Sequence, residues 1–127
     1  MALSDTISAL GTSIINLVDG KTIYQPITTL SNGTVALENK PTIYKITPSA
    51  ATTFTFSTTN LTLSSSRSYT FELCVDMSTV QTLTFPASVK WQDDETPDLS
   101  ETGTYFLVFR TIDGGTNWFG NLQGRWN

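Results

Sequence analysis

The feature that most constrains this chain is a hydrophobic period of two, which recurs in short segments from Lys21 onward. In SYTFELCVD, residues 68–76, large apolar residues alternate with polar or small ones. Successive side chains of a strand point to opposite faces, so this segment is predicted to form a strand with one buried face. The predicted inward residues are Tyr69, Phe71, Leu73 and Val75, and the outward ones are Thr70, Glu72, Cys74 and Asp76.

Nine other segments have strand-like alternation or composition: TIYQPITT, TVAL, TIYKIT, TTFTFS, LTLSS, QTLTF, ASVKW, TYFLVFRTI and NWFGNL. Turn residues, such as Asn32-Gly33, separate them at intervals of about eight to twelve residues. This arrangement predicts an all-β domain over residues 21–127, either an antiparallel β-sandwich or a jelly-roll-like domain of about ten short strands.

Residues 1–20 show a different period. Apolar residues recur there with alternating spacings of four and three, which predicts one stripe of a helix. The stripe residues are Leu3, Ile7, Leu10, Ile14 and Leu17. A single helix of this length that contains Gly11 is marginal in water, so its stripe needs a cover. The cover is either the chain's own β domain or other copies of the helix, and we interpret the segment as an anchor for assembly or docking.

The segment Tyr105-Phe106-Leu107-Val108-Phe109 breaks the alternation, because both of its faces are apolar. A strand of this kind is covered on both sides. One cover is the domain core, and the other is the N-terminal helix, a second sheet or another subunit. Together with the helical stripe, this strand predicts a homo-oligomer.

Length and charge exclude several classes of protein. The 127 residues fit one domain, and seven basic against eleven acidic residues give a net charge of −4. The basic residues form no stripe of the kind that binds phosphates, so we expect no nucleic-acid partner. The first 20 residues lack a basic start and a long apolar run, so we expect no signal peptide and no membrane segment.

The chain offers little reactive chemistry. It contains no histidine and no nucleophile elbow, phosphate-binding loop or paired-cysteine metal motif. Its one cysteine, Cys74, is interpreted as a small packed residue of a strand rather than as a reactive thiol. We therefore expect no enzymatic activity, no catalytic residues, no metal and no cofactor. The acidic segment Gln92-Asp93-Asp94-Glu95, with Asp98 and Glu101, is a candidate calcium loop, but a solvated connection explains it better.

Three tryptophans near turns or near the last residue are candidate glycan contacts: Trp91, Trp118 and Trp126. Exposed indole rings next to amides and acids can stack on sugars. The competing interpretation is that these rings fill the core of a small β domain.

The segment FRTIDGGTNWFG, residues 109–120, predicts a hairpin. Gly114 and Gly115 after Asp113 permit positive φ, so the chain can reverse with a twist that matches its strands. We expect Phe109 and Trp118 to cover one another across the sheet.

The last third of the chain resembles a β-module of tailed-bacteriophage structural proteins, with the pattern W…PxL…GxY…DGGxxWxG. The matching residues are Trp91, Pro97, Leu99, Gly103, Tyr105, Asp113, Gly114, Gly115, Trp118 and Gly120. Residues 92–95 depart from the pattern, since that family often has prolines and glycines there.

The resemblance implies a non-enzymatic virion protein: a head or tail fibre, a baseplate component, or an attachment on the capsid surface. It also implies a homotrimer whose N-terminal segment docks on other virion proteins. The alternative function is a carbohydrate-binding or host-receptor-binding module that uses Trp91, Trp118 or Trp126 on a host surface glycan.

Overall fold

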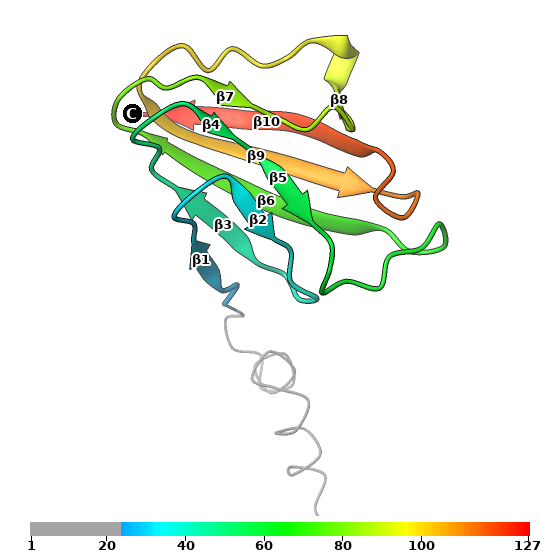
Figure 1. Ribbon diagram of the computed structural model, residues 1–127. Coiled ribbons are helices and arrows are strands. Elements are labelled where there is room, and N and C mark those ends of the chain that lie inside the picture. Colours follow the sequence, from blue (N-terminus) through cyan, green and yellow to red (C-terminus); the bar gives the residue numbers. More distant parts are fainter. Residues whose placement is uncertain (1–23) are drawn as a thin grey trace, which may run out of the picture.

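The computed structural model describes residues 24–127 (Figure 1). The predicted N-terminal helix and its stripe from Leu3 to Leu17 lie outside the described residues. The described part is built from strands, which confirms the all-β part of the predicted fold class. Its strands are β1 (Ile27–Thr29), β2 (Thr34–Ala36), β3 (Ile43–Ile46), β4 (Thr52–Thr53), β5 (Thr55–Ser57), β6 (Tyr69–Met77), β7 (Leu83–Thr84), β8 (Val89–Trp91), β9 (Gly103–Thr111) and β10 (Trp118–Trp126), with a 3₁₀ turn, η1 (Gln92–Asp94), after β8.

Six strands form one sheet in the order β1-β3-β6-β9-β10-β8. The central pairs β6–β9 and β9–β10 are antiparallel, whereas β1–β3, β3–β6 and β8–β10 are parallel. The sheet is therefore mixed, and the prediction of an antiparallel sheet holds only for its centre. Hydrophobic alternation shows which face of a strand is buried, but it carries no information on strand direction.

The predicted faces of β6 are confirmed by its pairing with β9. The register sets Phe71 opposite Phe109 and Leu73 opposite Leu107, so the buried residues of both strands share one face. Each such side chain stabilises the fold by about 1.5–3 kcal/mol when it leaves water. We call this buried side the inner face of the sheet and the opposite side its outer face.

Two short parallel pairs, β2–β5 and β4–β7, lie over the inner face (Figure 1). They contribute Val35 and, in part, Phe56 to the same hydrophobic core, and Phe54 joins it from the position between β4 and β5. Gly33, which directly precedes β2, marks a close approach to β4, since a Cβ built on it would lie 2.0 Å from the carbonyl oxygen of Thr53. The predicted strand LTLSS is wrong: residues 61–65 form no strand, although Leu61 and Leu63 pack against the core.

Two tyrosines fix the chain that leaves β2. The hydroxyl of Tyr69 donates a hydrogen bond to the carbonyl oxygen of Glu38 at 2.6 Å, and the amide of Glu38 donates to the hydroxyl of Tyr44 at 2.7 Å. Burial raises the pKa of Tyr69, with Tyr44 and Glu38 adding to the rise. The phenol of Tyr69 therefore stays neutral, and the hydrogen bonds of the two tyrosines hold the chain after β2 against β3 and β6.

Candidate functional site

The turn between β9 and β10 is organised by the carboxylate of Asp113. The amide of Asn117 donates to its Oδ1 at 2.9 Å, and the side-chain amide of Asn117 donates to its Oδ2 at 2.8 Å. The hydroxyl of Thr111 also donates to Oδ1 at 3.0 Å and accepts from the amide of Gly115 at 2.9 Å. These bonds from Asn117 and Thr111 hold the pKa of Asp113 below its ordinary value.

We expect Asp113→Asn to lower the melting temperature at neutral pH, because the charged acceptor is lost. A carboxyl whose pKa is lowered on folding adds stability above its unfolded value of 3.8, and this stability is lost as the pH falls through the folded value. The difference in melting temperature between wild type and variant should therefore shrink below about pH 4. Circular dichroism melts between about pH 2.5 and pH 7 measure it.

Glu95→Gln is the matched control, because the Glu95 side chain accepts no hydrogen bond from residues 24–127. Its melting temperature should follow that of the wild type at every pH. If the melting temperature of Asp113→Asn were lower than that of the wild type by the same amount at every pH, a role for the charge of Asp113 would be contradicted.

The hairpin has the predicted glycine turn but a different pairing of its large side chains. Gly114 and Gly115 have φ values of 73° and 89°, which supports the role assigned to them. Phe109, however, lies opposite Gly120 rather than covering Trp118. A Cβ on Gly120 would lie 2.8 Å from the ring of Phe109 and 3.0 Å from that of Trp91. The residue opposite Phe109 is thus a glycine because two aromatic rings occupy its inner side.

The three tryptophans lie in different surroundings. Trp118 is only 2% exposed and packs against Phe71, so it presents no ring face to a glycan. Trp91 is half-buried and packs edge-on against the rings of Phe85 and Phe109. Trp126 is 55% exposed. Trp118 is therefore wrong as a predicted glycan contact, and Trp126 is the most exposed of the three.

Tyr105 connects β9 to the segment that precedes it. Its hydroxyl donates to the carbonyl oxygen of Glu101 at 2.7 Å, and the amide of Glu101 donates back to the hydroxyl at 3.3 Å. The carboxylate of Glu101 pairs with the Arg125 guanidinium at 2.7 Å. Tyr105 and Arg125 thus hold the two ends of the hairpin strands together.

The acidic segment does not converge on a cation site in the described part of the chain. Asp93 and Asp94 lie in η1 with φ values of 57° and 58°. No group of three Asp, Glu, His or Cys side chains in residues 24–127 is arranged to hold a metal ion. No helix within this range is long and apolar enough to cross a membrane.

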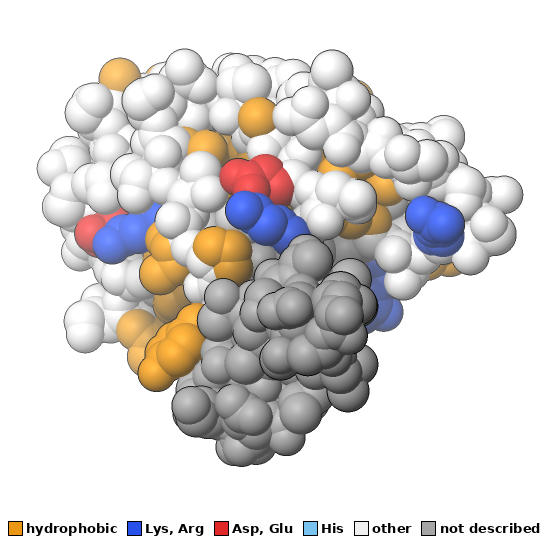
Figure 2. All heavy atoms as spheres, turned by 90° about the horizontal axis from the view of Figure 1, so that it is seen from below, with side chains coloured by type: hydrophobic (Ala, Val, Ile, Leu, Met, Phe, Trp, Pro, Cys, Tyr) orange, Lys and Arg blue, Asp and Glu red, His pale blue; other side chains and the backbone are white. Residues whose placement is uncertain are grey.

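The outer face of the sheet is the least covered surface of the central strands. Phe106 and Val108 of β9 lie on it and are half-buried, and Trp126 packs edge-on against Phe106 at a ring distance of 5.4 Å. Cys74 is buried on this face, and burial raises the pKa of its thiol, which disfavours the reactive thiolate. Figure 2 shows the molecule from below, where uncharged atoms predominate and hydrophobic side chains lie beside a few basic and acidic ones.

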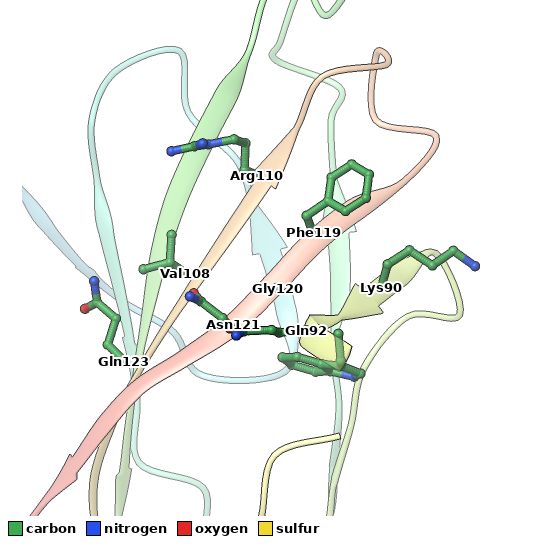
Figure 3. A pocket seen from close by; sticks show the side chains of 9 residues that line it. Lys90, Gln92, Val108, Arg110, Phe119, Gly120, Asn121 and Gln123 are labelled. Carbon is green, nitrogen blue, oxygen red and sulfur yellow. The ribbon is translucent and has the colours of Figure 1, made fainter. Parts of the chain in front are cut away.

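Strands β8, β9 and β10 surround an open hollow of about 380 Å³ on this outer face (Figure 3), which we call the outer hollow. The register places Arg110 beside Phe119 and Phe119 beside Lys90, in one row across three neighbouring strands. Adjacent strands are about 4.8 Å apart, so this row spans about 10 Å. Phe119 is 48% exposed and stands up from β10 in the close view, whereas Arg110 extends over β6 and Lys90 extends to the other side.

Three amide side chains line the outer hollow beside this row. Asn121 and Gln123 come from β10, and Gln92 comes from the turn that follows β8. Val108 lies opposite Asn121 and adds an apolar surface between them. The half-buried Trp91 also lines the hollow. The hollow thus combines the exposed ring of Phe119, this tryptophan, three amides and two basic side chains, and none of its lining residues is acidic.

The sequence contained one signal for this site. Trp118 and Phe119 are consecutive residues of one strand, so a buried Trp118 requires an outward Phe119. Grouping Phe119 with Arg110 and Lys90 requires the register of three strands, which the sequence does not reveal. In comparisons with known proteins, no family model, curated protein or solved structure matches the chain.

Proposed function

We propose that this chain is a non-enzymatic structural protein of a bacteriophage virion that assembles as a homotrimer. Support comes from the roles of the residues that resemble the phage module. Trp118 fills the core, Trp91 packs against it, Asp113 organises the hairpin turn, and Tyr105 holds the segment before β9. Each of these residues maintains shape, as a module that serves as a building block requires.

The single observation that carries the proposal is the hairpin, because its five turn-stabilising hydrogen bonds converge on Asp113 and Thr111. Such a turn fixes the relative position of β9 and β10 and hence the outer face that both strands display. In this proposal, the short strand pairs form the second sheet of a β-sandwich. In this proposal, the N-terminal segment docks on other virion proteins, and these partners determine whether the protein lies on the capsid, on a fibre or on the tail.

Leu10→Asp tests the assembly role of the N-terminal stripe. A buried charge in a helix bundle is strongly disfavoured, so the variant should sediment with the mass of one chain, whereas the wild type should sediment as a trimer. Circular dichroism of the two should agree in the β-sheet region, because residue 10 lies outside the β domain. Analytical ultracentrifugation at several protein concentrations measures the mass.

Thr12→Asp is the control, since residue 12 falls outside the stripe of the predicted helix and should leave the mass unchanged. A monomeric wild type at all concentrations, or a Leu10→Asp variant of unchanged mass, would contradict the assembly role. Imaging of purified particles with a label on the chain would then test whether it belongs to a virion.

A further inference from the structure

The outer hollow carries two basic groups without a carboxylate partner among residues 24–127. The ion pairs in that range join Lys40 to Glu38 and Arg125 to Glu101. Arg110 uses its Nε to donate a hydrogen bond of 3.3 Å to Thr70, which leaves its terminal nitrogens available. In a chain with a net charge of −4, two such cations on one rim create a local preference for an anion.

The acidic groups of β6 and of η1 do not line the hollow, although Asp93 and Asp94 directly follow Gln92 in the chain. Glu72 lies on β6 opposite Val108, and Asp76 lies further along the same strand, opposite Thr104. Neither forms an ion pair with Arg110 or Lys90 in the described range. The anion preference of the rim is therefore local and does not extend over the whole outer face.

The remaining lining groups match the chemistry of a sugar ring. An exposed phenyl face such as that of Phe119 carries negative π density, against which the C–H groups of a pyranose can pack. Asn121, Gln123 and Gln92 each offer donors and an acceptor, and sugar hydroxyls also donate and accept. An arginine fork binds a carboxylate through two parallel hydrogen bonds.

We propose that the outer hollow binds an acidic oligosaccharide. A pyranose ring packs on Phe119, its hydroxyls bond to the amides of Asn121, Gln123 and Gln92, and carboxylates pair with Arg110 and Lys90. The hollow is open, so a saccharide chain of several rings can continue beyond it along β10. Of the three tryptophans expected from sequence to contact a glycan, only Trp91 lines this site, and the proposal goes beyond a structural role in the virion.

Titration calorimetry of the full chain with trigalacturonic acid tests the proposal, and the methyl ester of the same trisaccharide is the matched ligand. We expect the ester to bind about tenfold more weakly, because it keeps every ring and loses the charges. A sialic acid trimer and a heparin hexasaccharide distinguish carboxylated from sulfated sources. Failure of all three acidic ligands to bind overturns the proposal, and equal binding of the ester overturns the assignment to an acidic ligand.

Phe119→Ala and Arg110→Gln should each weaken binding of trigalacturonic acid about tenfold. The controls are Ile112→Ala and Arg67→Gln, which change exposed residues that do not line the hollow and should leave binding unchanged. Equal affinity of all four variants overturns the site. A lower sedimented mass of Phe119→Ala would show that this face is a subunit interface, and it would also overturn the proposed binding site. The Leu10→Asp variant tests assembly independently of the ligand.

Discussion

Gly33→Ala is expected to destabilise the domain by about 3 kcal/mol, the upper end of the usual cost of overpacking, because the new methyl group meets fixed backbone atoms. The new Cβ would lie 2.0 Å from the carbonyl oxygen of Thr53 and 2.8 Å from its carbon, both backbone atoms. No rotamer change relieves such an overlap, so the chain at Gly33 must move away from Thr53 of β4. That movement also disrupts the hydrogen bond of 2.9 Å from the amide of Thr55 to the carbonyl oxygen of Gly33.

The loss would be a large share of the total stability of a domain, which is usually about 5–15 kcal/mol. Urea denaturation followed by tryptophan fluorescence measures it as a lower transition midpoint with an unchanged slope. Gly124→Ala is the matched control. Its Cβ would approach the far end of the Trp126 ring at 2.9 Å, and this exposed ring can swing away. The control should therefore cost less than about 1 kcal/mol, and equal losses in both variants would contradict the close approach at Gly33.

Gly33 also illustrates a role that could not be predicted from the sequence. The pair Asn32-Gly33 is typical of a turn, and the Thr34 amide does donate to the Asn32 side chain at 2.9 Å. The requirement for glycine arises instead from a strand some 20 residues further along the chain. The residues around Gly33 do not show which distant segment packs against them. The turn was therefore predictable from the sequence, and the packing role of Gly33 was not.

Strand existence and burial were predictable where one face of a strand meets the core. The alternation in β6 identified Phe71, Leu73 and Val75 as inward residues, and all three are buried. Leu61 and Leu63 have the same alternation but pack from a loop, because burial of alternate side chains does not require a ladder of hydrogen bonds. Hydrophobic alternation does not predict strand direction or register. Both determine which residues line the outer hollow.

Phe71→Ala is expected to cost about 3–5 kcal/mol, the usual range for removal of a buried phenylalanine ring. Phe71 is 2% exposed and lies at the centre of the aromatic core. It stacks on Phe109 at a ring distance of 5.2 Å and meets Phe56 and Trp118 edge-on at 5.0 and 5.4 Å. Because these rings come from the short strand pairs as well as from β9 and β10, the cavity would loosen both layers together.

Two further variants separate the causes of this loss. Phe71→Leu keeps most of the volume but removes the aromatic contacts, each worth about 0.5–1.5 kcal/mol, so its loss should fall between those of wild type and Phe71→Ala. Phe119→Ala removes the same ring from the exposed outer face and should change the free energy of unfolding by about 0.5 kcal/mol or less. If Phe71→Ala were no less stable than Phe119→Ala in urea denaturation, the core would not depend on the ring cluster around Phe71, and the inner and outer faces of the sheet would have been assigned wrongly.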